Sequence, residues 1–536
     1  MPPGSAAVSA ASFSHPCRCA LRSQGGSDSP KPKLVLPTAL ELGLAWQKLG
    51  AGYHRVVIAR VLCCLALLGL IGCRAEGRGR GAAAIDPAAY PPCDVPSDPY
   101  LPDKTVQGPG APLWIRRFGC QADDRAMGVV IERDGHVVAT GSFAGRVSFG
   151  DAPLVSGGTR DAFVARWDED GKSVWSLRLG GVNSEARGTN LTLGARGELV
   201  VAGRFHGVLD ATRPQLMSRG LDPFLLMMKQ DGTFLWAQRF DRAGTSDQGK
   251  VPAAADPFGG VLLPVAPSGP RATDGVVVRV DPSGDLRGQV PLPEGHASSL
   301  AVHADRTVLV AGHGGFQAAP TAPAGRGRMR IAPGAGTTVR QLFLAMYDDK
   351  ARRTWVRTIG DARAKSFGEP LIAVDADGSG YVTFTFQGGV DVGTGLLESG
   401  GGFDLLVMKV DRVGRTVWAR AFPGPQGNEW VNAIAVDRAG NVVLGGAFER
   451  AVDFGGGPIM STGPVSGFVA RLDNLGRHVW SRVFGAQGSS AVVEAVALGS
   501  TGNVAVAGAF QGWTDFGGGL VPSSGAWDGF VALLGP

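Results

Sequence analysis

Two segments of this chain carry carboxylates at a spacing that suggests metal binding. Asp375 and Asp377 lie in the segment DADGSG, and Asp168 begins the similar segment DEDG. A calcium loop needs several oxygen ligands and usually a later bidentate glutamate, and neither segment supplies that set. Both segments also fall where a tight turn is required, so we favour a turn over a metal site. We therefore expect no cofactor, and calcium at Asp375 and Asp377 is the weaker alternative.

Catalytic chemistry is not indicated by any motif. None of the eight histidines falls in an HExxH or other zinc spacing. The sequence contains no GxSxG segment, no Walker loop and no paired Cys and His suited to nucleophilic catalysis. We therefore assign no catalytic residue from the sequence.

A cysteine near the N-terminus has the context of a lipid attachment site. Residues 54–60 contain three basic side chains, residues 61–72 are apolar or small, and Cys73 follows. This order is typical of a secretory signal, and the apolar segment is shorter than a membrane span. Residues 70–73 (LIGC) resemble a lipobox, in which the cysteine thiol is acylated and becomes the mature N-terminus. An ordinary signal peptide or a buried helix is the alternative.

The signal segment divides the chain into four parts. Residues 1–55 precede it, and we expect them to be untranslated, with the true start near residue 56, or disordered; a long signal n-region is the alternative. Residues 56–72 form the lipoprotein signal peptide. Residues 73–111 are rich in Gly, Ala and Pro, which suits a flexible tether. Residues 112–536 form one large domain.

Cysteine usage predicts one disulfide. Of the seven cysteines, two lie upstream of the signal, two lie within it, and Cys73 is the predicted lipid attachment site. Cys93 and Cys120 remain, and an even remainder in an oxidising compartment suggests a bond between them. Two free thiols are the alternative, because a separation of 27 residues does not define their geometry.

An internal repeat defines the architecture of residues 112–536. Tryptophans recur at steps of 61, 61, 63 and 62 residues, with one gap of 119 that is close to two periods. A long period of this kind indicates a repeat fold. The tryptophan marks are Trp114, Trp175, Trp236, Trp355, Trp418 and Trp480. A second position of the unit is marked by Phe163, Phe403, Phe468 and Phe530.

Each unit holds four apolar segments separated by Gly, Asp and Asn, which is the pattern of short β-strands joined by tight turns. In the sixth copy we expect strands A to D at residues 431–437, 441–448, 467–473 and 478–485. The marked phenylalanine opens strand C, and the marked tryptophan lies in strand D. Gly288 stands where a seventh tryptophan is expected, which explains the double gap.

The strand count predicts how the repeats close. The first copy begins with a D strand at residues 113–119, before any A, B or C strand, and the last copy ends before its D strand. The N-terminal strand therefore completes the last sheet. Seven four-stranded antiparallel sheets closed in this way form an all-β, seven-bladed β-propeller, and closure removes the exposed sheet edges.

The repeat resembles the bacterial seven-bladed β-propeller repeats of the SBBP type, which occur in surface and secreted proteins. The matching segments are SGGTRDAFVARWDEDGKSVW, SGGGFDLLVMKVDRVGRTVW and STGPVSGFVARLDNLGRHVW, and the similarity covers about residues 112–536. The resemblance implies the propeller fold. It implies little about activity, since members of this family mostly have no assigned activity.

The charge of the chain argues against nucleic acid as a partner. Residues 1–80 hold ten Lys and Arg against three acidic residues, which leaves 42 basic and 44 acidic residues in the remainder. A nearly neutral propeller has no electrostatic footprint for nucleic acid.

These features favour an exported lipoprotein of the bacterial outer membrane or cell surface that binds or scaffolds a protein or polysaccharide as a monomer. A secreted or periplasmic protein is the alternative localisation, and a glycan-cleaving hydrolase or lyase with its site at the channel mouth is the alternative function. A purely structural envelope role is a third option. We expect binding through the irregular connections at residues 241–250, 317–340 and 360–370. The predicted channel positions share no common charge and indicate no ligand: Asn190, Lys250, Ser298, Glu369, Asn432 and Glu494.

Overall fold

The computed structural model describes residues 108–120, 122–210, 215–240, 249–265, 275–292, 295–314, 341–360, 363–425 and 427–536. All of them belong to one compact unit, Gly81–Pro536. The predicted lipid attachment site Cys73, Cys93 and the connection 317–340 lie outside the described residues. The structure records Cys120 as disulfide-bonded, and its pairing with Cys93 stays a prediction. In the part of the chain that is described, no helix is long and apolar enough to cross a membrane.

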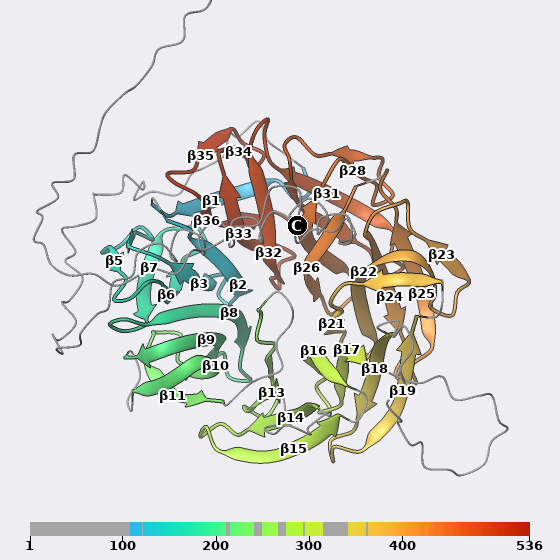
Figure 1. Ribbon diagram of the computed structural model, residues 1–536, viewed down its shortest axis with the longest axis horizontal. Coiled ribbons are helices and arrows are strands. Elements are labelled where there is room, and N and C mark those ends of the chain that lie inside the picture. Colours follow the sequence, from blue (N-terminus) through green and yellow to red (C-terminus); the bar gives the residue numbers. More distant parts are fainter. Residues whose placement is uncertain are drawn as a thin grey trace, which may run out of the picture. The chain divides into compact units, whose positions relative to one another are not determined.

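The described strands form seven antiparallel sheets of the predicted four-stranded kind, arranged as blades of a β-propeller (Figure 1). The innermost strand of each blade contacts the innermost strand of the next blade, and that of blade seven contacts that of blade one. The ring is therefore closed. The predicted all-β, seven-bladed propeller is confirmed.

Each blade runs from an innermost strand A to an outermost strand D. Blade one comprises, in this order, β2 (Arg125–Ile131), β3 (Val137–Phe143), β6 (Asp161–Trp167) and β7 (Ser173–Leu179). Blade two comprises β8 (Glu185–Leu193), β9 (Leu199–Leu209), β10 (Leu216–Met228) and β11 (Phe234–Arg239). Blade three comprises β12 (Ala254–Ala255), β13 (Val261–Val265), β14 (Gly275–Val280) and β15 (Leu286–Leu292). Blade four comprises β16 (His296–Val302), β17 (Val308–Gly314), β18 (Gln341–Tyr347) and β19 (Arg353–Ile359).

In blade five the innermost position is divided between β20 (Ala364–Phe367) and β21 (Leu371–Val374), followed outward by β22 (Gly380–Asp391), β24 (Asp404–Val410) and β25 (Thr416–Phe422). Blade six comprises β26 (Glu429–Val436), β27 (Val442–Phe448), β30 (Ser466–Leu472) and β31 (His478–Phe484). Blade seven comprises β32 (Ser490–Leu498), β33 (Val504–Gln511), β36 (Asp528–Leu534) and β1 (Pro112–Phe118). Short strands extend the B–C connections: β4 (Arg146–Val147), β5 (Leu154–Val155), β23 (Leu396–Glu398), β28 (Ala451–Val452), β29 (Ile459–Met460), β34 (Trp513–Asp515) and β35 (Leu520–Pro522).

The N-terminal strand closes the ring as the sequence predicts. Strand β1 pairs antiparallel with β36, with Trp114 opposite Leu533 and Phe118 opposite Gly529. A further backbone hydrogen bond runs from the Gly535 N–H to the Ala111 carbonyl at 2.8 Å. The two strands, one from each end of the domain, thus form one continuous ladder.

Most of the marked tryptophans join neighbouring blades. In each case the indole N–H donates to a carbonyl in the C–D turn of the next blade, at distances of 2.8 to 3.1 Å. The ring also covers the turn glycine: Gly171 has a φ of +76°, and a Cβ there would lie 2.6 Å from the Trp114 ring. We call this contact the tryptophan clasp. Its donors are Trp114, Trp175, Trp236, Trp355 and Trp418.

The clasp changes at two junctions of the ring. Trp480 packs against Gly110, which precedes β1 and takes the place of the C–D turn glycine in blade seven. The indole nitrogen of Trp480 has no partner among the described residues. Between blades three and four, Gly288 replaces the tryptophan and the turn carries Ala351 at a φ of +61° instead of glycine. The tryptophan and the glycine beneath it are therefore lost together.

The junction of blades three and four adds a charged contact to a buried apolar cluster that includes Leu292 and Phe343. Arg306, in the A–B turn of blade four, donates to the buried Asp256 of blade three at 3.0 Å. The Arg306 guanidinium also lies 5.0 Å from the centre of the Phe258 ring. An ion pair and a cation–π contact thus join the A–B turns of these two blades, away from the C–D turn where the clasp forms elsewhere.

One marked phenylalanine occupies a different position from the one predicted. Phe163, Phe468 and Phe530 face glycines on strand B, and a Cβ on Gly141 would lie 2.8 Å from the Phe163 ring. Phe403 instead lies one residue before β24, and the equivalent of Phe163 is Leu406, opposite Phe384. In blade five the aromatic side chain lies on strand B, as Phe384, instead of on strand C. The pair of facing residues still fills the space, but the phenylalanine stands at a different position of the repeat.

The aspartates considered as calcium ligands cap a turn. Asp375 Oδ1 accepts the N–H groups of Asp377 and Ser379 at 3.0 and 2.9 Å. Its Oδ2 accepts from Lys409 at 3.0 Å and from the Tyr381 hydroxyl at 3.2 Å. Within the described ranges, no group of three His, Cys, Asp or Glu side chains is placed to hold a metal ion. The Asp375 carboxylate is thus engaged by the turn and by side chains of strands B and C.

Candidate functional site

The channel is lined by residues that β-bulges turn inward. The ladder between strands A and B slips by one residue in most blades, and the extra residue bends the innermost strand. The bulged residues are Met127, Thr189, Ser298, Asn432 and Glu494, and all of them line a cavity of about 220 Å³ within the channel. The six channel positions expected from the sequence all line this cavity. These lining positions make the channel polar, and they share no charge that repeats from blade to blade.

Lys250 changes the character of the channel. It precedes strand A of blade three, yet its ammonium donates to the backbone carbonyls of Glu494 and Asn432, at 2.7 and 3.0 Å, in blades seven and six. The Glu494 carboxylate lies 3.5 Å from the same nitrogen. Burial lowers the pKa of Lys250, and the Glu494 charge partly offsets this effect. One lysine thus ties opposite sides of the ring together across the channel.

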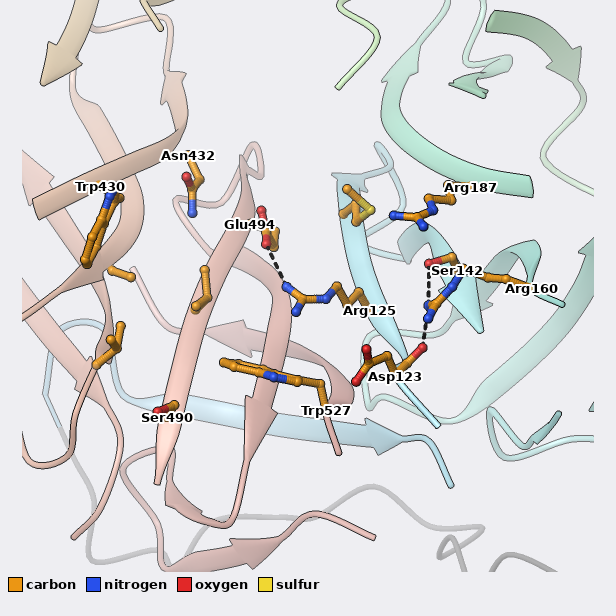
Figure 2. A pocket seen from close by; sticks show the side chains of 14 residues that line it. Asp123, Arg125, Ser142, Arg160, Arg187, Trp430, Asn432, Ser490, Glu494 and Trp527 are labelled. Atoms are coloured by element: carbon orange, nitrogen blue, oxygen red, sulfur yellow. Dashed lines mark hydrogen bonds and ion pairs between the residues drawn. The ribbon is translucent and has the colours of Figure 1, made fainter. Parts of the chain in front are cut away.

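A larger cavity of about 600 Å³ opens where the A strands begin, on the side of the ring that carries the D–A and B–C connections. Its wall comes from blades six, seven, one and two (Figure 2). We call it the mouth pocket. Its aromatic or charged side chains are Asp123, Arg125, Arg160, Arg187, Trp430, Glu494 and Trp527.

The mouth pocket is built from two repeat positions. The residue just before strand C accepts a backbone hydrogen bond, at 2.7 to 3.1 Å, from the residue at the start of the next blade's strand A. The residue that follows this donor on strand A then faces the mouth. At the first position the pocket presents Val465, Trp527 and Arg160, and at the second it presents Trp430, Val492, Arg125 and Arg187.

This equivalence shows which side chains the fold requires. Blade six carries Val465 where blade one carries Arg160, and blade seven carries Val492 where blade two carries Arg187. Because the same backbone accommodates valine, neither arginine is needed to build the blade. The fold therefore does not require the charged and aromatic side chains of the pocket, and they are candidates for binding a ligand.

The charged residues form two groups. Arg125 lies 3.6 Å from the Glu494 carboxylate and 4.9 Å from the centre of the Trp527 ring. Arg160 donates to the Asp123 carbonyl and, at 3.3 Å, to the Ser142 hydroxyl. Burial lowers the pKa of Arg160, and the charge of Arg187 lowers it further.

Behind the pocket, buried carboxyls sit between blades. Burial raises the pKa of Asp124 to about 7, and the nearby Asp528 adds to the shift. Burial likewise raises the pKa of Asp528 to about 6. Burial and the charge of Asp404 raise the pKa of Glu429 to about 9. Asp124 accepts the N–H groups of Cys120 and Ala144 at 3.0 and 2.9 Å, and Asp528 accepts that of Ser524 at 2.8 Å, so these two carboxyls hold neighbouring D–A and B–C connections.

The mouth pocket differs from the site expected from the sequence. The mouth pocket lies on four regular blades, whereas the sequence predicts binding at the connections 241–250, 317–340 and 360–370. Residues 241–248 and 317–340 lie outside the described residues, so that expectation stays a prediction. The sequence does hold a signal for the pocket. Trp430 and Trp527 fall outside the 61-residue period of the clasp tryptophans, as do the buried Trp167 and the exposed Trp513, which do not line the pocket.

Comparison with known proteins does not assign the chain to a family. No protein-family model matches the chain, so the SBBP-type resemblance stays a prediction. Over 147 residues the chain is 31% identical to the regulatory protein FlaEY of Caulobacter vibrioides, a stretch covering 26% of this chain and 15% of that protein. The chain thus spans only a small part of that relative.

Among solved structures, the Dos1 propeller has a TM-score of 0.36 and 8% identity over 78% of this chain and 94% of its own. A protein of unknown function from Dyadobacter fermentans has a TM-score of 0.33 and 12% identity, over 79% and 99%. An ulvan lyase of family PL25 has a TM-score of 0.37 and 10% identity, over 73% and 93%. Similarity at this level carries no argument about function.

Proposed function

We propose that this protein is a lipid-anchored binding or scaffolding propeller of the bacterial cell envelope, with its ligand at the mouth pocket. The observation that carries the proposal is the pocket itself: a cavity of about 600 Å³ lined by charged and aromatic side chains at positions where other blades have valine. Its volume falls in the range of ligand sites. The anchor follows from the sequence around Cys73 and the tether at residues 73–111.

Binding is favoured over glycan cleavage by the state of the pocket's carboxylates. A hydrolase needs two carboxyl groups facing one glycosidic bond. The mouth pocket offers those of Asp123 and Glu494, and Glu494 is already paired with Arg125 and Lys250. No His or Tyr side chain lines the described pocket.

The anchor is tested by replacing Cys73 with Ala in the native organism. We expect the Cys73→Ala variant to leave the membrane fraction, because its acylation site is gone. Cys64→Ala is the matched control, since Cys64 lies within the signal segment and is not the predicted acylation site. Membrane retention of Cys73→Ala equal to that of the control would refute the anchor.

Ligand binding is tested with the full chain carrying Cys73→Ala, applied to arrays of glycans and purified envelope proteins. Trp527→Val is the site variant, because valine is the residue that blade six has at this position. We expect a ligand whose binding Trp527→Val weakens. Release of sugar products from a bound glycan during long incubation would favour the enzyme instead.

A further inference from the structure

The charge of the mouth pocket is concentrated on the wall formed by blades one and two. The hydrogen bonds of Arg160 go to a carbonyl and a hydroxyl, and no carboxylate among the described residues lies within ion-pair distance of it. Arg187 pairs with Glu185 at 2.6 Å, and half of its side chain is exposed. Both guanidinium groups thus keep donors that face the cavity.

A third arginine stands behind this pair. Arg204 lies opposite Arg187 in the β8–β9 ladder. Its Nε and Nη2 atoms are buried and have no partner among the described residues, and burial followed by the Arg187 charge lowers its pKa. Asp123 and Asp124 attract Arg160, but burial leaves Asp124 with a pKa of about 7, so it is only partly ionised at neutral pH. The wall therefore carries excess positive charge.

The other side of the pocket is aromatic. Blades six and two flank blades seven and one, so Trp430 lies across the pocket from Arg187, as Figure 2 shows. The Trp430 side chain is partly exposed, and one face of Trp527 already carries Arg125. An indole face of this kind packs against the C–H face of a sugar ring by dispersion and burial of apolar surface.

We propose that the mouth pocket binds an acidic oligosaccharide, with its carboxylate or sulfate held by Arg160 and Arg187 and a sugar ring packed on Trp430. Planar guanidinium groups bind such anions through paired, charge-assisted hydrogen bonds. The inference rests on the proposed function, because it names the ligand class of the same site. A nucleic acid would need a continuous basic stripe, whereas residues 81–536 hold 42 basic and 44 acidic residues.

The test is calorimetric titration of the full chain carrying Cys73→Ala. The carboxylate probe is tetragalacturonate, the sulfate probe is a sulfated galactose tetrasaccharide, and fully methyl-esterified tetragalacturonate is the neutral match. We expect at least one acidic probe to bind, the ester to bind at least about tenfold more weakly, and added salt to weaken the acidic probe. Which acidic probe binds more tightly decides between carboxylate and sulfate.

The site variants are Arg160→Val and Arg187→Val, which copy the residues of blades six and seven. Each is expected to weaken the acidic probe by about tenfold, the loss typical of one charge-assisted hydrogen bond. Arg438→Val is the control, because Arg438 is exposed on an A–B turn, on the face of the propeller opposite the mouth pocket. It removes the same charge and should leave the affinity for the acidic probe unchanged. Melting curves will establish whether each variant is folded. If Arg160→Val does not fold, Arg187→Val still tests the inference.

Several outcomes would overturn the inference. They are failure of both acidic probes to bind, equal binding of the ester, full affinity in the folded arginine variants, or tighter binding of a single-stranded oligonucleotide of equal charge. If the array yields a neutral glycan or a protein that Trp527→Val weakens, the proposed function stands and only the ligand class is wrong. If the array yields no ligand, both fail.

Discussion

The outer rim and the mouth of the propeller use tryptophan in different ways. On the rim, Trp418 is 7% exposed, donates to the Asn474 carbonyl of the next blade at 3.0 Å, and recurs with the period. At the mouth, Trp430 and Trp527 are partly exposed, line a cavity and break the period. Periodic residues therefore hold the ring together, whereas departures from the period at equivalent positions build the site.

The largest expected effect comes from removing the strand that both regions depend on. Deleting β1 (Pro112–Phe118) removes the buried side chains of Trp114, Ile115 and Phe118 and exposes the edge of β36. We expect a loss of at least about 5 kcal/mol in unfolding free energy, measured by urea denaturation. A deletion variant with unchanged stability would show that blade seven does not need this strand.

The second prediction sets the two kinds of tryptophan against each other. Trp418→Ala should lower the unfolding free energy by about 3 kcal/mol, because it opens a cavity and removes the clasp. Trp430→Ala should cost about 1 kcal/mol or less, because its side chain is partly exposed. The same denaturation experiment measures both. Equal losses would erase the distinction between rim and mouth.

The third prediction concerns a carboxyl that supports the mouth. The folded state raises the pKa of Glu429 from 4.5 to about 9, so folded protein keeps this proton while unfolded chain loses it above about pH 4.5. Its contribution is full below pH 4.5 and is lost as pH rises toward 9. Glu429→Gln should therefore gain stability over the parent by at least about 1.4 kcal/mol between pH 5 and pH 9, equivalent to one pKa unit.

Thermal unfolding of parent and Glu429→Gln across this pH range makes the measurement, and their difference isolates Glu429. Asp134→Asn, at an exposed turn residue whose pKa is lowered, is the control and should gain no stability at high pH. A parent and variant that respond identically to pH would contradict a raised pKa.

The smallest effect is expected at the junction without a clasp. Arg306→Gln removes the ion pair with Asp256 and should cost about 1 kcal/mol, since Arg279 still lies 3.4 Å from that carboxylate. Because the Arg306 contact is an ion pair, the loss should shrink at high salt, whereas the loss from Trp418→Ala should persist. A salt-independent loss at Arg306 would mean that its packing on Phe258 matters more than its charge.

The fold was predictable because the clasp, which forms at five of the seven junctions, needs two specific residues wherever it forms. An indole must cover a turn glycine with positive φ, so Trp and Gly recur together, and both vanish together at Gly288 and Ala351. Phe403 was misplaced because blade five moves its large side chain to Phe384. Two facing strands can therefore keep the same total side-chain volume while the large residue changes strand, and a repeat pattern read on one strand misses this exchange.

The site was less predictable because it is made of exceptions. Arg160, Trp527 and Val465 share one backbone position but no chemistry, so no pattern marks them before the strands are aligned. Lys250 reaches across the channel from an irregular connection, and its partners are backbone carbonyls that carry no sequence signal. The tryptophans outside the period were a partial clue, because Trp430 and Trp527 line the pocket whereas Trp167 and Trp513 do not.

The most direct test of the separation between rim and mouth is a crystal structure of the chain with the acidic tetrasaccharide that binds more tightly. We predict that its anionic group lies within hydrogen-bond distance of Arg160 and Arg187, with a sugar ring on Trp430 and the clasps unchanged. A ligand bound on the opposite side of the ring or along the clasp tryptophans would contradict the account.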